Sequence, residues 1–157
     1  MDRTVVLMET PLNAATAHAE FLVSHGHHGA VAAFTGVVRG ENGLGDGLNS
    51  GRIDHLHLDW YPGMTEASLD AIADAAAQRF DIRALGILHR CGEVQAGEPV
   101  VFVAAAARHR RAAFDAVDYM MDRLKSEAAL WKREAGPDGE RWVEPTQEDG
   151  DALKRWP

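Results

Sequence analysis

The sequence predicts an α+β fold with a mixed or antiparallel sheet, and three observations support this class. Strand-like and helix-like segments follow one another in the order β-α-β-β-α-β-β-α-β-β, joined by hairpins or single helices. No GxGxxG motif follows a strand and opens a helix, which argues against a doubly wound nucleotide-binding fold. The chain has 157 residues, 46% of them hydrophobic and 25% charged, as is typical of one globular domain with its own core.

Hydrophobic periodicity gives the individual elements. Alternating or continuous apolar runs predict strands at residues 4–8, 29–38, 52–60, 84–94, 99–106, 130–134 and 141–144. Apolar stripes with helical spacing predict helices at residues 11–23, 65–80 and 109–128. Thr10, followed by Pro11, and Thr65 are the expected caps of the first two helices. The apolar stripe of the third helix is expected to be Phe114, Val117, Met121 and Leu124.

Two hairpins and three regions organise the chain. Turns at 95–98 and 137–140 are expected to join antiparallel neighbours. Residues 1–145 are expected to form a single catalytic α+β domain, and five glycines predict a mobile loop at 40–51. Residues 146–157 are expected to be a polar tail, either loose or shortly helical.

Charge limits the classes of ligand. The net charge of −8 argues against a nucleic-acid surface. Residues 108–133, however, carry seven basic side chains against four acidic ones. This cationic segment in an acidic chain favours a small anionic ligand or an anionic peptide end.

Cysteine usage and hydropathy indicate the cellular setting. Cys91 is the only cysteine, so no internal disulfide can form and a cytoplasmic location is expected. The first residues lack the apolar core of a signal peptide, and no run approaches the roughly 20 apolar residues of a membrane helix. With one cysteine, which more often packs as a small apolar residue, any sulfur chemistry would need an outside sulfur donor.

Lysine is scarce in this chain. Thirteen arginines stand against three lysines, Lys125, Lys132 and Lys154. Unlike arginine, a desolvated lysine can lose its proton and act as a nucleophile or general base. Lys125 and Lys132, seven residues apart, are therefore candidate catalytic residues, although composition supports solvated surface charges equally well.

Other polar clusters are weaker candidates. Arg108, His109, Arg110 and Arg111 open the third helix, where free N–H groups bind anions, but exposed arginines paired with nearby aspartates are the simpler interpretation. Arg39 ends a strand beside the glycine-rich loop. His25, His27 and His28 lie between glycines with no cysteine or carboxylate at zinc-like spacing, so no metal is expected.

Four segments in order resemble the large, catalytic subunit of molybdopterin synthase. They are GAVAAFTGVVRG (29–40), LDWYPGMTEASL (58–69), ILHRCGEVQAGEPVVFVAAAARHRRAAFDA (87–116) and YMMDRLKSEAALWKRE with RWVE (119–144). The resemblance implies a hammerhead-like α/β domain with ferredoxin-like elements and a small additional β-subdomain. Two departures are Asp59-Trp60 before YPGM and a longer, more glycine-rich loop.

The resemblance also implies roles for individual residues. Lys125 and Lys132 match the active-site lysines of the family, and Lys125 is favoured as general base or transient acyl acceptor. The implied substrate-binding residues are Val37, Val38, Arg39, His109, Arg110, Arg133 and Glu134. Arg39, His109 and Arg110 would hold the pterin and its phosphate, and Arg133 and Glu134 would line the same pocket.

The implied reaction is sulfur transfer without a cofactor. Cyclic pyranopterin monophosphate would become molybdopterin by gaining two dithiolene sulfurs, each delivered as the C-terminal thiocarboxylate of a small ubiquitin-like partner ending in Gly-Gly. A homodimer with one small subunit at each end, a heterotetramer, is the expected assembly.

Two other functions stay open at this point. The chain could be a non-catalytic binding module for an acidic Gly-Gly peptide tail, with the lysines acting only as a clamp. It could also be a partner-independent phosphate-ester enzyme of ferredoxin-like fold.

Overall fold

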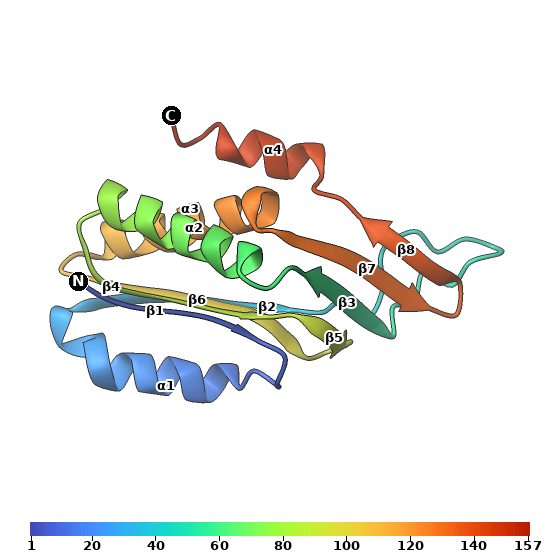
Figure 1. Ribbon diagram of the computed structural model, residues 1–157, viewed down its shortest axis with the longest axis horizontal. Helices are drawn as coiled ribbons and strands as arrows, with labels where there is room; N and C mark the ends of the chain where they lie inside the picture. The colour runs from blue at the N-terminus through green and yellow to red at the C-terminus, as the bar shows by residue number, and fades with distance from the viewer.

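Two β-sheets make up the strand framework of the protein, in a computed structural model that describes residues 1–157 (Figure 1). The first sheet has the order β1-β4-β6-β2. Its strands are β1 (Asp2–Met8), β4 (Ile82–Arg90), β6 (Pro99–Ala107) and β2 (Ala30–Val37). Because β1 runs parallel to β4 and the other pairs are antiparallel, the sheet is mixed, which confirms the predicted α+β class.

The second sheet is antiparallel and continues from one end of the first (Figure 1). Its order is β5-β3-β7-β8. The strands are β5 (Gly92–Gln95), β3 (His55–Trp60), β7 (Leu130–Gly136) and β8 (Gly139–Val143). This sheet is the additional β-subdomain that the resemblance implies.

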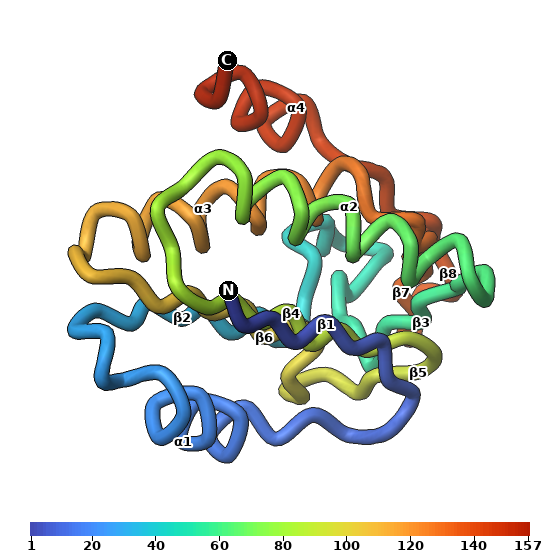
Figure 2. Tube along the Cα trace, turned by 60° about the vertical axis from the view of Figure 1, so that its left-hand side comes forward, coloured from blue at the N-terminus to red at the C-terminus, as the bar shows by residue number.

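Helices cover both faces of the first sheet (Figure 2). Helix α1 (Ala14–His25), followed by a short 3-10 turn (Gly26–His28), lies on one face. Helices α2 (Met64–Arg79) and α3 (Arg110–Glu127) lie on the other, and α4 (Gln147–Leu153) packs outside α3. None of these helices is both long enough and apolar enough to cross a membrane.

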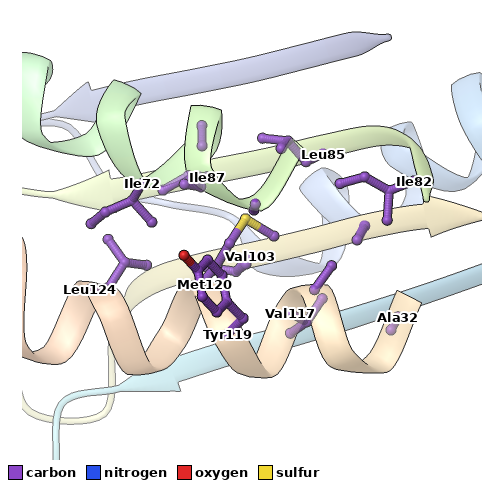
Figure 3. Close-up of a cluster of buried hydrophobic side chains, with 14 of the residues drawn as sticks. Ala32, Ile72, Ile82, Leu85, Ile87, Val103, Val117, Tyr119, Met120 and Leu124 are labelled. Atoms are coloured by element: carbon purple, nitrogen blue, oxygen red, sulfur yellow. The ribbon is translucent and has the colours of Figure 1, made fainter. Parts of the chain in front are cut away.

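The main core fills the space between the first sheet and helices α2 and α3 (Figure 3). Alternation along β6 divides its side chains between two cores. Val103 and Ala105 face α2 and α3, whereas Phe102 and Ala104 face α1. All four are at most 2% exposed, so the strand is buried on both faces. A third, smaller cluster supports the second sheet.

The helix starts differ from the sequence-based expectation. Asn13, not Thr10, caps α1, and its side chain accepts a hydrogen bond from the Thr16 N–H at 3.0 Å. Helix α2 begins after Gly63, so the prediction that Thr65 is its cap is wrong. The Thr65 hydroxyl is buried, accepts from the Tyr61 N–H and donates to the Ala129 carbonyl.

The predicted strand at 84–94 is in fact two strands. The chain bends at buried Cys91, whose N–H donates to the Met8 carbonyl at 2.9 Å, and then enters the second sheet as β5. The turn at 95–98 therefore joins β5 to β6 across two sheets and does not close a hairpin. The prediction that Phe114 belongs to the apolar stripe of α3 is also wrong, because its side chain is 55% exposed on the outside of the helix.

The C-terminal residues form a packed helix with an aromatic anchor. The Trp156 ring makes edge contacts with Phe80 and Tyr119, and its indole N–H donates to Asp122 at 2.7 Å. Arg155 pairs with Asp118 and Asp122 on α3. The polar tail expected at 146–157 is thus shortly helical and is held against α3.

Gly136, at the end of β7, lies directly under the backbone that leads into β3. A Cβ at this position would lie 2.1 Å from the Arg52 carbonyl oxygen. The Asp54 N–H donates to the Ala135 carbonyl at 2.8 Å, which holds the two segments at this separation. No side chain fits there without moving backbone.

We predict that Gly136→Ala destabilises the protein by about 1–3 kcal/mol, because the added methyl group forces the two backbones apart. Gly26→Ala is the matched control, because Gly26 has a helical φ of −61° and nothing lies within 4 Å of its would-be Cβ. Urea unfolding of both variants measures the difference. Equal midpoints would show that the contact is not rigid.

Candidate functional site

A pocket of about 310 Å³ lies where the two sheets meet the C-terminal end of α3. Both candidate lysines line it, Lys125 from the last turn of α3 and Lys132 from β7. Exposed Arg39, apolar Val37 and buried His89 also line it. The apolar wall includes Phe34, Val101, Met121 and Leu124. We call this cavity the lysine pocket.

Local structure explains how the lysines meet. Lys125 is exposed on the last turn of α3, and the chain then returns as β7, in which Lys132 pairs with Leu58 of β3. At the opposite wall, the register of β2 on β6 shifts between Gly36 and Val37. This irregularity interrupts the regular ladder just before Arg39, which lies beyond the strand end and reaches the same pocket.

The electrostatics of the lysine pocket are one-sided. Three cationic side chains line it, Lys125, Lys132 and Arg39, and no carboxylate does. Burial, helped by the charge of Lys125, lowers the pKa of Lys132 to about 8, against a partial opposing effect of Asp149. At pH 7 about one tenth of Lys132 is therefore a neutral amine, whereas an ordinary lysine is almost entirely protonated.

His89 is a pocket residue that sequence reasoning missed. It is 5% exposed, and its Nδ1 lies 2.7 Å from the Arg90 carbonyl oxygen. Burial, together with the charges of Lys132 and Lys125, lowers the pKa of His89 to about 4, so the ring is neutral near pH 7. Strand alternation puts His89 on the same face as Leu85 and Ile87, and that pattern was the available signal.

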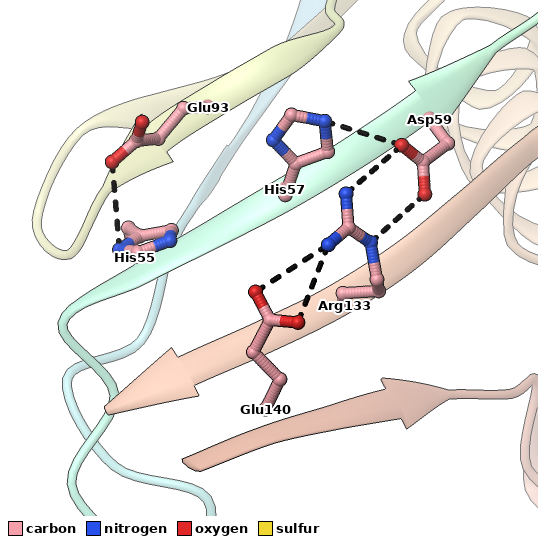
Figure 4. A network of polar contacts seen from close by, with 6 residues as sticks. All are labelled: His55, His57, Asp59, Glu93, Arg133 and Glu140. Atoms are coloured by element: carbon pink, nitrogen blue, oxygen red, sulfur yellow. Dashed lines mark hydrogen bonds and ion pairs between the residues drawn. The ribbon is translucent and has the colours of Figure 1, made fainter. Parts of the chain in front are cut away.

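Arg133 lies outside the lysine pocket, because successive residues of a strand point to opposite faces. Its side chain points instead toward Asp59 and Glu140 (Figure 4). Its guanidinium binds the Asp59 carboxylate through two hydrogen bonds of 3.0 and 3.1 Å and also contacts Glu140. The pair lowers the pKa of Asp59, which also contacts His57 at 3.2 Å. Within one chain Arg133 therefore joins β3, β7 and β8.

Glu134 is buried, but it faces a second hollow of about 240 Å³ beside the glycine-rich loop. Its Oε1 accepts hydrogen bonds from Arg141 at 2.8 Å and from Asn42 at 2.9 Å. Glu134 thereby anchors the loop to the second sheet. The expected placement of Arg133 and Glu134 in the pocket of the lysines is not found in the single chain.

His109 and Arg110 are also separated from the lysines. They begin α3, whereas Lys125 lies at its other end. At 1.5 Å per residue, the helix puts roughly 24 Å between His109 and Lys125. Both side chains of this pair are exposed, so they are free to meet a ligand or another chain.

Val37 and Val38, the remaining candidate substrate-binding residues, differ in burial. Val38 is 5% exposed in the small core with Ile53 and Leu58, so of the two valines only Val37 lines the lysine pocket. No group of three or more His, Cys, Asp or Glu side chains is positioned to hold a metal ion.

This arrangement suits a narrow anionic ligand that reacts with an amine or is activated by one. Three cations without a counter-ion attract and hold a negative group. A neutral amine among them can accept a proton or attack a carbonyl carbon. The apolar wall lowers the polarity around them, which strengthens these interactions.

The model of the MoaE protein family matches residues 7–127. A molybdopterin synthase catalytic subunit from Caulobacter vibrioides is 43% identical over 152 residues, which cover 97% of this chain and 96% of the relative. The subunit of that name from Escherichia coli is 45% identical over 136 residues, with 87% of each chain covered.

Solved structures agree with these relatives. The molybdopterin biosynthesis MoaE protein from Burkholderia ambifaria superposes with a TM-score of 0.77 at 36% identity, covering 99% of this chain and 98% of that one. A complex of subunits 1 and 2 of molybdopterin-converting factor from Helicobacter pylori contains a chain with a TM-score of 0.68 at 18% identity, covering 88% of this chain and 89% of that one. At that identity the likeness concerns the fold alone.

We predict that Lys125→Met raises the pKa of Lys132 above its value of about 8, because a like charge is removed. The pKa should stay below 10.5, because burial is the larger cause of the shift. With only three lysines in the chain, ¹³Cε-lysine NMR resolves each of them, and Lys132→Arg assigns the resonance. Lys154→Met is the control. An unchanged Lys132 titration would show that the two amines do not interact.

Proposed function

Since the chain belongs to the MoaE protein family, we propose that it catalyses the sulfur-transfer step that yields molybdopterin. Cyclic pyranopterin monophosphate is the proposed substrate, and the C-terminal thiocarboxylate of a small ubiquitin-like subunit is the proposed sulfur source. The observation that carries the proposal is the pairing of Lys125 and Lys132 in one pocket that no carboxylate lines. A site built for a cationic or neutral ligand would not gather three cations.

The proposed roles follow from position and charge. Lys125 and Arg39 hold the anionic groups, namely the thiocarboxylate and the substrate phosphate. The low pKa of Lys132 suits it to the general-base role, because a base must be unprotonated at working pH. The resemblance instead favours Lys125 as the amine that acts as general base or transiently accepts the acyl group. We therefore propose that one of the two lysines has this role.

The partner tail is proposed to enter the lysine pocket in an extended form. Two terminal glycines have no side chains, so the tail is narrow, and its thiocarboxylate end carries a negative charge that the cations attract. A volume of about 310 Å³ holds a short peptide end or a small heterocycle but not a folded domain. The small subunit would therefore dock outside and insert only its tail.

A second copy of the chain is proposed to complete the site. His109 and Arg110 cannot reach Lys125 in the same chain, because α3 holds them at its far end. Strand β2, which lines the lysine pocket, is an edge strand, and its Phe34 and Val37 are 43% and 49% exposed. An unpaired apolar edge beside the pocket favours another chain docking there. In this homodimer, the core of a heterotetramer, His109 and Arg110 of one copy would bind substrate in the pocket of the other.

Arg133 and Glu134 are proposed to support substrate binding from outside the pocket. Their ion pairs fix β7 and the base of the glycine-rich loop, and these two segments carry Lys132 and Arg39. A cytoplasmic location, expected from the sequence, stays a prediction.

We predict that Lys125→Ala and Lys132→Ala each lower the rate of dithiolene formation by about 10²–10³-fold, because each removes a group that stabilises the reacting charge. Lys125→Arg and Lys132→Arg should restore tail binding more than turnover, because arginine keeps the charge but cannot lose a proton. The assay mixes each variant with the thiocarboxylated partner and the pterin precursor. Lys154→Ala is the matched control.

Two outcomes would contradict this assignment. Full turnover by both arginine variants would leave only a charge clamp and favour the non-catalytic binding module. Product formation without any small partner would favour the partner-independent phosphate-ester enzyme.

We predict that two inactive variants complement each other if the site is shared between copies. His109→Ala and Lys132→Ala chains, mixed and allowed to exchange, form heterodimers that each contain one intact site. At random exchange, about one quarter of wild-type activity should return. The control mixes Lys125→Ala with Lys132→Ala, which lie in the same pocket and should not complement. Equal recovery in both mixtures would argue against a shared site.

A further inference from the structure

We propose that His89 is a positioning residue of the lysine pocket, whose unprotonated Nε2 accepts a hydrogen bond from the Lys132 side chain. This role of His89 rests on the proposed function only for its effect on turnover, because the interaction with Lys132 can be measured without substrate.

The hydrogen bond at Nδ1 fixes which ring nitrogen carries the proton. The Arg90 carbonyl oxygen, 2.7 Å from Nδ1, can only accept, so Nδ1 must donate. In a neutral imidazole the other nitrogen is then a bare acceptor. His89 therefore presents a lone pair at Nε2, and the ring lines the lysine pocket.

Few acceptors are available to the cations of this pocket. Lysine and arginine side chains only donate in their charged forms, and no Asp, Glu, Asn or Gln lines the cavity. Among the lining side chains, the Thr35 hydroxyl and the His89 ring are the only oxygen or nitrogen acceptors. His89 is the one that is buried, so its position is set by the sheet and not by solvent.

Strand geometry brings His89 and Lys132 to the same cavity. His89 lies near the end of β4, on the face of the first sheet that α2 and α3 cover. Lys132 enters from β7 of the second sheet, next to the C-terminal end of α3. In the structure the His89 ring is hydrogen-bonded only to the Arg90 carbonyl, and rotation about the flexible four-carbon stem of Lys132 would bring its nitrogen to Nε2.

A neutral acceptor can orient the Lys132 nitrogen without keeping it protonated, which a carboxylate could not do. A carboxylate beside Lys132 would stabilise the ammonium form and keep the amine protonated. A protonated imidazole would repel the ammonium group and could not accept a hydrogen bond. Neutral His89 can accept from either form of the lysine, so it orients the nitrogen while leaving the proton free to dissociate.

Other charges act on the same pair. Lys125 and Arg39 share the pocket with Lys132, and Asp149 of the α4 segment acts on Lys132 from outside. The charged groups that act on His89 are Lys132 and Lys125. A test must therefore change His89 alone and leave these four groups in place.

The test is a ¹³Cε-lysine NMR titration of full-length protein carrying His89→Phe, His89→Gln or His89→Glu. Loss of the acceptor in His89→Phe should lower the Lys132 pKa by about 1, because the ammonium form loses a hydrogen bond. The His89→Glu carboxylate should raise that pKa by about 1 or more. The His89→Gln side chain keeps a neutral acceptor and should leave it near the wild-type value.

Controls separate this role from simple space filling. The three variants should have far-UV circular dichroism spectra like the wild type. If His89→Phe does not fold, the difference in Lys132 pKa between His89→Glu and His89→Gln decides whether His89 acts on Lys132. A Lys132 pKa that is the same in every folded variant overturns the proposal.

Turnover supplies an independent readout. If the proposed function is right, His89→Phe should lower kcat with little change in KM, and His89→Gln should recover most of it. A chain that shows the NMR shifts but no sulfur transfer would overturn the proposed function and keep the role of His89. Normal kcat in His89→Phe, with sulfur transfer intact, would overturn the positioning role.

Discussion

Close packing of α3 on the first sheet determines where the candidate site forms. Ala105 and Ala107 of β6 face Ala113 and Ala116 of α3, and all four are at most 1% exposed. Small side chains on both surfaces let the helix lie near the sheet. The C-terminal turn of α3 then ends beside the junction of the two sheets, where the chain returns as β7. Larger residues on either surface would lift the helix and separate the two amines.

The lysine pocket works against the stability of the folded chain. Desolvating an amine beside two other cations is unfavourable, and nothing inside the cavity neutralises them. Many arginines of the chain are paired, as Arg133 is with Asp59 and Arg155 with Asp122. Desolvation of an unpaired cation such as Lys132 is typical of sites where ligand binding supplies the missing charge. An anion bound only by the folded state would stabilise it by mass action.

Much of the fold and part of the site could be predicted from the sequence. Periodicity located the helices and most strands, and the scarcity of lysine marked Lys125 and Lys132 before the pocket was known. The errors arose at positions whose structure depends on contacts with residues that are distant in the sequence. The break at Cys91 depends on which sheet each half joins, and the outward position of Phe114 depends on α3 packing through alanines. The use of Arg133 in ion pairs depends on Asp59 of β3 and Glu140 of β8, which only the folded sheet brings next to it. His89 was missed because a buried histidine shows its tautomer only through its neighbours.

The glycine-rich loop is attached only at its base. Asp138 of the β7–β8 turn accepts from the Ser50 and Gly51 N–H groups, and Asn42 is held by Glu134. Between these anchors, residues 43–49 make hydrogen bonds only within the loop, to Glu41, Asn42, Asp46 and Asn49. Evolution can therefore lengthen or shorten this tip while the ends of the loop, and with them Arg39, keep their positions. The same tip offers protein engineers a place for a reporter peptide outside the lysine pocket, which none of residues 43–49 lines.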